Sequence, residues 1–310
     1  VYKRQRCFPP LLMSHAFGLC VVVVLPILIR LRLVIYTTPL HPTIIPELIY
    51  DSRATMVVGT DTFVAAWGKN AHPYDFSTVH TLLLGAEKVK TKTRELFNDK
   101  EGVRITEGYG VSEASPVLAA NNLINNRIGS IGRIVPGVEY KVEPVEGVAV
   151  GGRLVVKGPN IMMGYLWPEN PGAIVPPKDG WYDTGDIVEV DEDGYIWIKG
   201  RFKRFAKIGG EMVSLAAVEE VAAALWPGKS QVVLAMDDES KGEKLVFVTQ
   251  ESAPDLPALW QALKEAGLPE LSYPRQFIQL KEIPITPLGK VNMPKVIEEA
   301  KAAAVAAGVV

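Results

Sequence analysis

Two runs of alternating apolar and polar residues predict a β-hairpin in the second half of the chain. Residues 187–190 and 195–199 carry the alternation, and Asp193-Gly194 supplies the turn between them. Because the two ends of a hairpin lie close together, we expect Asp186 and Arg201 to meet at its open end. A carboxylate beside a guanidinium can hold a pair of ribose hydroxyls or a phosphate. A surface hairpin with a salt bridge at its base is the simpler alternative.

Apolar runs that alternate with helical stretches predict a parallel α/β sheet in the first half of the chain. The strands are expected at residues 55–59, 79–84 and 103–106, and the helices at residues 60–67 and 89–99. Ligands of such sheets bind at the carboxyl ends of the strands. The segments that follow the second and third strands are therefore candidate binding loops.

The two candidate loops carry residue types that suit a nucleotide. The first is residues 85–87, and the second is residues 107–113. In the second loop, Tyr109 can stack on a base and Ser112 can hydrogen-bond a phosphate. Glu113 can present a carboxylate to Mg²⁺, which takes one or two carboxylates together with phosphate oxygens. A glycine-rich turn with a structural tyrosine is the alternative.

The patterns after residue 121 predict a small β-subdomain and then a separate C-terminal domain. Glycines between residues 129 and 152 separate short β-patterned runs. Helix caps and further strands follow Gly210. The caps are Ser214 and Asp255, and the strands are expected at residues 231–236, 244–249 and 276–280.

These elements predict an α/β fold with an incomplete large domain followed by a smaller α+β domain. The large domain is expected over residues 8–200, with an α/β part at 8–125 and the β-subdomain at 126–200. The smaller domain is expected over residues 201–302 and to move about a hinge near Lys203.

An apolar run at residues 11–35 resembles a membrane span, which needs about 20 consecutive apolar residues. Pro26 interrupts the run, and Arg30 and Arg32 close it. Four consecutive valines, residues 21–24, are typical of a buried strand or helix of a large α/β core. We therefore expect a buried element, with a membrane span as the alternative.

Composition argues against several classes of function. The formal net charge of -2 is not typical of a nucleic-acid-binding protein, and two cysteines do not make a disulfide framework. The four histidines lack metal-ligand spacing.

Residues 201–207 interleave basic and aromatic side chains, which suits single-stranded nucleic acid or an anionic membrane surface. A non-catalytic binding module is therefore a competing hypothesis, although the Gly209-Gly210 pair that follows is better explained by a hinge.

Taken together, four ordered motifs resemble those of the adenylate-forming enzymes, which include acyl-CoA synthetases, peptide-synthetase adenylation domains and luciferases. The motifs are residues 107–113, with Ser112 where the family carries Thr, and residues 182–186, 200–211 and 284–290. His15-Ala16-Phe17-Gly18 also resembles the segment beside the family's acyl pocket. The resemblance implies ATP and Mg²⁺ as cofactors and a fatty acid as substrate.

The resemblance also implies a role for each matching residue. Glu113 would hold Mg²⁺ against the triphosphate, and Lys290 would bridge the attacking carboxylate and the α-phosphate. Asp186 would accept both ribose hydroxyls, His15 would be a third catalytic residue, and Lys203 would be the hinge. The other nucleotide-binding residues would be Gly85, Ala86, Glu87, Tyr109, Gly110, Ser112, Ile198 and Arg201, and the thiol channel would be lined by Lys207, Gly209 and Gly210.

Within the family, the resemblance is greatest to the synthetase half of bacterial bifunctional acyl-[acyl-carrier-protein] synthetase/2-acylglycerophosphoethanolamine acyltransferases. Residues 158–166, 204–215 and 268–271 carry it. It implies transfer of the acyl group to acyl carrier protein and a lysophospholipid substrate for an upstream acyltransferase. It also implies a location at the cytoplasmic face of the bacterial inner membrane, and no nucleic-acid partner. A synthetase that uses free CoA is the alternative.

One motif of the family is not found in the 310 residues. This is the Ser/Thr/Gly-rich phosphate loop, which ends in Gly-Lys and precedes the acyl-pocket segment. The chain also starts without an initiator Met. We therefore expect an N-terminally truncated chain that by itself forms little or no acyl adenylate.

Overall fold

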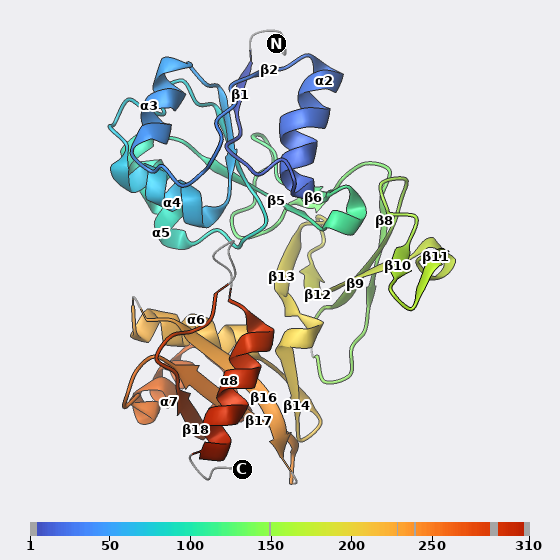
Figure 1. Ribbon diagram of the computed structural model, residues 1–310, viewed down its shortest axis with the longest axis vertical. Coiled ribbons are helices and arrows are strands. Elements are labelled where there is room, and N and C mark those ends of the chain that lie inside the picture. Colours follow the sequence, from blue (N-terminus) through green and yellow to red (C-terminus); the bar gives the residue numbers. More distant parts are fainter. Residues whose placement is uncertain (1–4, 149, 228, 239, 286–290, 307–310) are drawn as a thin grey trace. The chain divides into compact units, whose positions relative to one another are not determined.

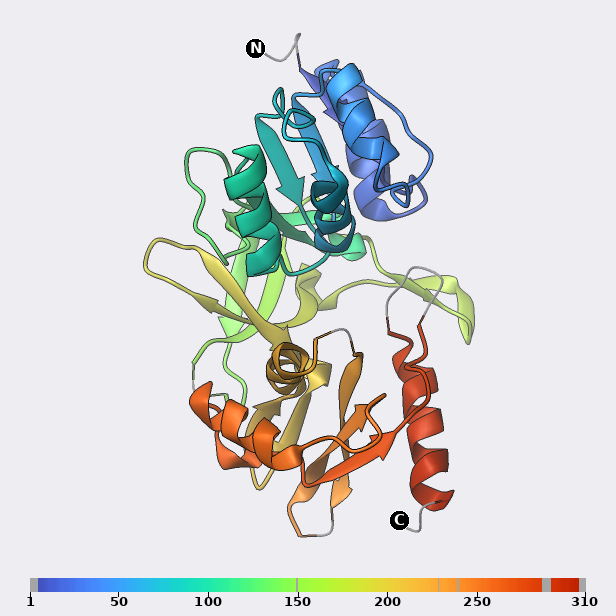
Figure 2. The ribbon, with the colours of Figure 1, turned by 90° about the vertical axis from the view of Figure 1, so that its left-hand side faces the viewer.

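The computed structural model describes residues 5–148, 150–227, 229–238, 240–285 and 291–306, and shows a mixed α/β protein (Figures 1 and 2). The chain divides into two compact units. The first contains Val1–Glu143, Leu154–Thr184 and Val188–Ile198, and the second contains Pro144–Arg153, Gly185–Ile187 and Lys199–Val310. The predicted fold class is confirmed. Two short segments of the expected large domain group with the second unit, and the expected domain boundary near residue 200 stays a prediction.

A seven-stranded sheet forms the centre of the first unit, in the order β2-β1-β3-β4-β5-β6-β7. The pairs between β2 and β5 are parallel, and β6 and β7 are added antiparallel. The strands are β1 (Arg6–Phe8), β2 (Arg32–Leu33), β3 (Met56–Gly59), β4 (Thr81–Leu84), β5 (Ile105–Gly110), β6 (Val117–Ala120) and β7 (Arg133–Ile134). The sequence patterns missed β1, β2, β6 and β7. β1, β2 and β7 have only two or three residues, which are too few to show an alternation.

Helices cover both faces of the parallel strands, as the alternation of buried side chains requires. On one face, Phe8 and Val57 pack with residues of α3 (Ile44–Asp51) and α4 (Asp61–Asn70). On the other face, the neighbouring positions Cys7 and Val58 pack against Val21. The first face is extended by α5 (Thr91–Leu96) and the π-helical segment η3 (Phe97–Glu101).

The apolar run near the N-terminus forms a helical segment and not a strand. It consists of α1 (Ala16–Gly18), a π-helical segment η2 (Leu19–Val24) and α2 (Leu25–Ile29). The expectation of burial holds for Val21, Val22, Pro26 and Leu31, whereas Ile27 is 72% exposed and Leu28 is 73% exposed. Among the described residues, no helix is long and apolar enough to cross a membrane.

A four-stranded sheet, β13-β12-β9-β8, contains the predicted hairpin. The strands are β8 (Glu139–Glu143), β9 (Gly152–Lys157), β12 (Tyr182–Val190) and β13 (Ile196–Arg201), and a separate pair is β10 (Tyr165–Trp167) with β11 (Asn170–Val175). The hairpin is longer than its alternation predicted, so that Asp186 and Arg201 lie inside the strands. At its turn, Asp191 Oδ1 accepts the Asp193 and Tyr195 N–H groups at 3.0 and 2.8 Å.

The second unit contains a sheet of order β15-β14-β17-β16, with β18 beside β17. Its strands are β14 (Phe205–Ile208), β15 (Glu211–Ser214), β16 (Gln231–Asp238), β17 (Gly242–Thr249) and β18 (Gln276–Gln279). One face packs against α6 (Leu215–Leu225) and α7 (Leu256–Glu265), and the other against α8 (Met293–Ala306). The expected caps are confirmed: Ser214 Oγ accepts the Ala217 N–H at 3.3 Å, and Asp255 Oδ1 accepts the Ala258 N–H at 3.0 Å.

Candidate nucleotide- and acyl-binding site

The segment that follows β4 meets the predicted acyl-pocket segment. Gly85 is buried, and a Cβ atom placed on it would lie 3.3 Å from Cζ of Phe17 and 3.4 Å from the carbonyl oxygen of Gly108. Ala86 follows with a φ of 67°, a left-handed conformation that non-glycine residues rarely adopt. The structure therefore brings together three stretches that the sequence placed apart: residues 15–18, 85–87 and the end of β5.

Two of the predicted residues in these stretches accept hydrogen bonds at the first turn of a helix. Glu87 Oε2 accepts the Thr62 N–H at 3.2 Å and the Thr62 hydroxyl at 2.6 Å, at the first turn of α4. His15 is exposed, and its Nδ1 accepts the Phe17 N–H at 3.3 Å at the start of α1. These contacts are structural, so a role for Glu87 at adenine or for His15 in catalysis stays a prediction.

The predicted loop at residues 107–113 is largely a strand. Residues 107–110 are the last four of β5, and Glu107 is buried and forms an ion pair with Arg94. Gly110 has no room for a side chain, because a Cβ atom would lie 2.1 Å from the carbonyl oxygen of Pro116. The expectation of an exposed loop was wrong for this part, since sheet pairing with β6 continues through Gly110. Only the turn after the strand projects beyond the sheet.

The turn after β5 holds Glu113 in a defined position. It is a single 3-10 turn, Ser112–Ala114, with Ser112 exposed. Glu113 Oε1 accepts the Tyr165 hydroxyl at 2.9 Å, and the Glu113 carbonyl accepts the Met162 N–H at 2.8 Å. The Asn160 side-chain amide donates to the carbonyl of Ala114 at 2.9 Å. Glu113 is thereby fixed both through its carboxylate and through its backbone.

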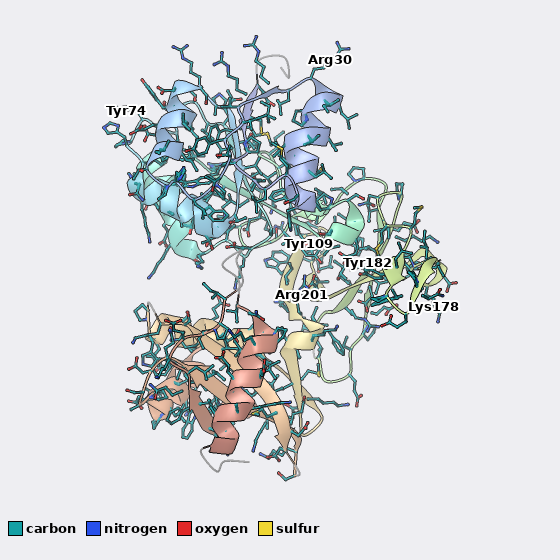
Figure 3. All side chains as sticks on the ribbon, viewed as in Figure 1. Arg30, Tyr74, Tyr109, Lys178, Tyr182 and Arg201 are labelled. Atoms are coloured by element: carbon teal, nitrogen blue, oxygen red, sulfur yellow. The ribbon has the colours of Figure 1, made fainter. Side chains whose placement is uncertain are left out.

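Two tyrosines complete the surroundings of Glu113. The Tyr165 and Tyr182 hydroxyl oxygens are 3.5 Å apart. Burial, followed by the Glu113 carboxylate, raises the pKa of Tyr165, and the hydrogen bond with Tyr182 offsets part of this rise. Tyr165 therefore stays a neutral donor to Glu113. Tyr109 and Tyr182 both pack against the core cluster of Leu154, Val188 and their neighbours, and Figure 3 labels them at the end of β5 and the start of β12.

The Glu113 carboxylate suits a Mg²⁺ ion whose other ligands are phosphate oxygens of a substrate and water. Over the part of the chain that the structure describes, no group of three or more His, Cys, Asp and Glu side chains is placed to hold a metal ion. Mg²⁺ is usually held by one or two carboxylates and by phosphate oxygens and water, not by a cage of protein ligands. A single fixed carboxylate at the carboxyl edge of the sheet fits that mode.

The carboxylate and the guanidinium predicted to meet at the hairpin do so. Arg201 Nε lies 3.1 Å from Asp186 Oδ1, and the two side chains are 66% and 3% exposed, respectively. The buried carboxylate thus orients an arginine whose side chain is largely exposed. Ile198, on the same strand as Arg201, is 38% exposed. The proximity is confirmed, whereas contact with a ribose stays a prediction.

The basic residues after the hairpin are mostly paired. Arg204 forms an ion pair with Glu219, and Lys207 Nζ lies 2.9 Å from Glu146 Oε2. Lys203 is exposed and has no ion pair with another described residue. Arg201, in turn, is paired with Asp186.

The predicted thiol-channel glycines form the turn between β14 and β15. Gly209 and Gly210 have φ values of 59° and 92°, as a two-residue turn between antiparallel strands requires. Gly147 lies against this hairpin: its carbonyl accepts the Met212 N–H at 3.3 Å. This contact explains why the segment Pro144–Arg153 groups with the second unit. Lys290, in contrast, lies outside the described residues.

Sequence reasoning missed the residues that support the candidate site. Tyr165 and Asn160 hold Glu113 and its turn, and Arg94 pairs with Glu107. Tyr165 is 52 positions from Glu113 in the sequence, so no local periodicity could connect them. The only signal was that Asn160 and Tyr165 fall in a stretch that resembles the adenylate-forming family.

Comparisons with known proteins agree with this geometry. Residues 2–166 match the model of the AMP-binding enzyme family. The chain is 30% identical over 299 residues to a long-chain-fatty-acid–CoA ligase of Bacillus subtilis, covering 92% of this chain and 52% of that protein. It is 33% identical over 250 residues to a long-chain-fatty-acid–CoA ligase of Yersinia pestis, covering 77% and 44%. The chain thus spans about half the length of these relatives.

The fold also matches solved structures. O-succinylbenzoate coenzyme A synthetase from Bacillus subtilis, in complex with ATP and magnesium ion, superimposes with a TM-score of 0.80 at 22% identity, covering 97% of this chain and 62% of that one. ATP-bound MatB from Rhodopseudomonas palustris gives 0.79 at 24% identity, covering 97% and 62%. Because the family model covers residues 2–166 and the Bacillus ligase aligns over 92% of the chain, the chain belongs to the AMP-binding enzyme family.

Proposed function

We propose that this chain is the nucleotide- and acyl-binding part of a ligase that activates a fatty acid as its acyl adenylate and then transfers the acyl group to a thiol. The observation that carries the proposal is Glu113, fixed by Tyr165 at 2.9 Å on the turn that ends β5. Phe17 and Gly85 lie at the same edge of the sheet, where α/β proteins bind their ligands. The similarity to long-chain-fatty-acid–CoA ligases supports a fatty acid as the acid.

In the first step, the fatty-acid carboxylate would attack the α-phosphorus of ATP, and pyrophosphate would leave on the opposite side. Asp186 would accept the ribose hydroxyls, and Tyr109 would pack against the base. Glu113 would be the protein ligand of Mg²⁺, which when bound neutralises charge on the phosphate oxygens. Lys290 would bring a positive charge to the attacking carboxylate and the α-phosphate, where negative charge develops.

In the second step, a thiolate would attack the acyl carbonyl carbon, and AMP would leave with the electron pair of the broken carbon–oxygen bond. Lys203 is exposed and unpaired among the described residues. Rotation about Lys203 would withdraw Lys290 from the candidate site and bring the turn at Gly209 and Gly210 to it. A turn of two glycines is suited to line a channel, because a thiol chain can approach its backbone without meeting a side chain.

Free CoA is the acceptor that we favour, because the curated relatives named above are CoA ligases. Acyl carrier protein is the second candidate, supported by the resemblance of residues 158–166 and 204–215 to that subgroup. An acidic carrier protein would need free cations on this chain, and the pairing of Arg204 with Glu219 and of Lys207 with Glu146 reduces their number. A lysophospholipid substrate and a location at the inner membrane rest on the same subgroup resemblance.

The thioester step can be tested directly with the 310-residue chain. Synthetic palmitoyl adenylate is supplied with CoA or with holo acyl carrier protein, and thioester formation is followed by mass spectrometry. We expect catalysed formation of palmitoyl-CoA, and a slower reaction with the carrier protein. A rate no higher than that without protein would contradict the proposed function. With ATP and free palmitate, we expect ATP–pyrophosphate exchange near background, because the phosphate loop is not among these residues.

A further inference from the structure

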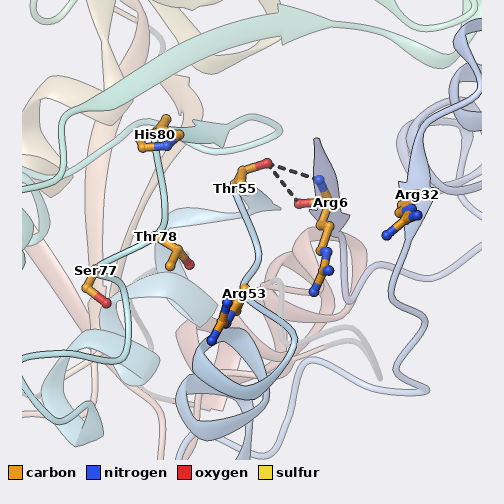
Figure 4. A pocket seen from close by; sticks show the side chains of 7 residues that line it. All are labelled: Arg6, Arg32, Arg53, Thr55, Ser77, Thr78 and His80. Carbon is orange, nitrogen blue, oxygen red and sulfur yellow. Dashed lines mark hydrogen bonds between the residues drawn. The ribbon is translucent and has the colours of Figure 1, made fainter. Parts of the chain in front are cut away.

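A basic pocket lies at the amino edge of the parallel sheet, at the opposite ends of the strands from the candidate ligase site. Its volume is about 470 Å³. The lining side chains come from β1, from β2 and from the segments that precede β3 and β4 (Figure 4). They are Arg6, Arg32, Arg53, Thr55, Ser77, Thr78 and His80.

Strand register places four of these residues in one row. Arg6 is paired with Arg32 in the parallel pair of β1 and β2. The Thr55 N–H donates to the Arg6 carbonyl at 2.9 Å, and the His80 N–H donates to the Thr55 carbonyl at 2.9 Å, which continues the row across two more chain segments. Residues at one level of neighbouring strands project from the same face of a sheet. The alignment of these four residues therefore follows from the register of the strands.

The positive charge of the pocket is uncompensated. Among the described residues, no carboxylate forms an ion pair with Arg6, Arg32 or Arg53. Arg6 is held in place, because its Nη1 donates to the Ser52 carbonyl at 2.7 Å and its N–H donates to Thr55 Oγ1 at 3.0 Å. This cluster of guanidinium groups contrasts with a chain whose formal net charge is -2.

Arg53 occupies a backbone position that favours glycine. Its φ is 49°, just after the C-terminus of α3. The Arg53 N–H donates to the Tyr50 carbonyl at 2.9 Å, and the Ala54 N–H donates to the Ile49 carbonyl at 3.0 Å, the pattern of a left-handed helix end. Arginine is disfavoured there, and a non-glycine residue in this region is often kept for what its side chain does.

We propose that this pocket binds a compact multivalent phosphate anion, either a phosphomonoester or pyrophosphate. Guanidinium groups bind phosphate oxygens through paired N–H donors, and the Ser77 hydroxyl and His80 add further polar groups around them. The Thr78 hydroxyl donates to the Ala54 carbonyl at 2.7 Å and shapes the wall of the pocket. An anion is favoured over a neutral or cationic ligand, because three guanidinium groups face the same pocket. The volume accommodates a group of this size with room for an attached alcohol.

The test is calorimetric titration of the chain with pyrophosphate, without Mg²⁺ and at physiological salt, so that the candidate ligase site is not loaded through its metal. Arg53→Gly removes one cation from the pocket and relieves a disfavoured φ. Arg104→Gln removes a cation just before β5, at the same edge of the sheet but outside the pocket. We expect Arg53→Gly to weaken binding at least about tenfold without lowering Tm, and Arg104→Gln to change it less than about twofold.

Two results would overturn the proposal: no saturable binding of pyrophosphate to the folded chain, or equal losses in the two variants. The source of the phosphate is separated with vesicles. Binding to phosphatidate vesicles that pyrophosphate displaces, and that Arg53→Gly weakens, would indicate a lipid phosphomonoester. Binding of pyrophosphate with no such vesicle binding would indicate a soluble phosphate compound.

Discussion

Replacing Asp186 with asparagine tests the proposed nucleotide site at one defined contact. The Asp186 side chain is 3% exposed, and its Oδ1 lies 3.1 Å from Arg201 Nε. If the carboxylate accepts both ribose hydroxyls, each hydrogen bond to a charged group contributes about 1.5–3 kcal/mol. Removal of one hydroxyl from the ligand should then weaken its binding by at least about tenfold.

The assay compares AMP with 2′-deoxy-AMP and 3′-deoxy-AMP by calorimetry, for the parent chain and for Asp186→Asn. We expect the parent chain to bind each deoxy ligand more weakly than AMP. We expect the variant to bind the three ligands within about threefold of one another, because the asparagine amide is neutral and has only one acceptor oxygen. Undiminished discrimination in the variant would refute the role of Asp186.

The same substitution also affects stability. Exposed ion pairs contribute about 0–1 kcal/mol and broken buried pairs cost about 3–5 kcal/mol, so a pair with one buried and one exposed partner should cost about 1–2 kcal/mol in urea unfolding. Asp191→Asn is the matched control, because Asp191 pairs with Arg127 at the turn of the same hairpin. It should lower stability but leave the ribose discrimination intact.

Three further substitutions test separate parts of the structure. Gly110→Ala should lower the free energy of unfolding in urea by at least about 2 kcal/mol, because the new Cβ atom would lie 2.1 Å from the Pro116 carbonyl oxygen. Gly172→Ala is the control: a Cβ atom there meets nothing within 4 Å, so the free energy of unfolding should change by less than about 0.5 kcal/mol. Lys290→Ala should leave thioester formation from palmitoyl adenylate within about twofold, since its proposed role is in adenylation; a much larger loss would contradict that division of roles. Burial raises the pKa of Glu101, and the ammonium of Lys100, whose Nζ lies 3.7 Å from Glu101 Oε1, offsets only part of this rise. A raised carboxyl pKa lowers stability as the pH rises through it, so Glu101→Gln should raise Tm near pH 7 and change it little near pH 4; an unchanged Tm near pH 7 would contradict this.

The parts of the fold that could be predicted from the sequence are those determined by residues close together in the chain. The hairpin around Asp193-Gly194 and the helices capped by Ser214 and Asp255 each follow from residues within a few positions of one another. The contact of Asp186 with Arg201 follows from the same hairpin geometry. Such features depend on turn chemistry and side-chain alternation, which the sequence displays directly.

The parts that sequence did not predict depend on contacts between distant segments. Residues 21–24 were compatible with a buried strand or a buried helix, and the fold shows that they lie in a helical segment that packs on a sheet face through Val21. The residue types of the stretch 107–113 indicated an exposed loop. Glu107 is nevertheless buried in β5, because its carboxylate is paired with Arg94. The support of Glu113 by Tyr165 crosses 52 positions, and only the assembled fold shows it.

The central claim is that this chain holds an acyl adenylate, and binding of a stable mimic measures it most directly. Palmitoyl-sulfamoyl adenosine lacks the β- and γ-phosphates, so its binding does not depend on the family's phosphate loop. We predict saturable binding to the 310-residue chain that AMP displaces and that Asp186→Asn weakens at least about tenfold. Absence of binding to a chain that circular dichroism shows to be folded would contradict the account.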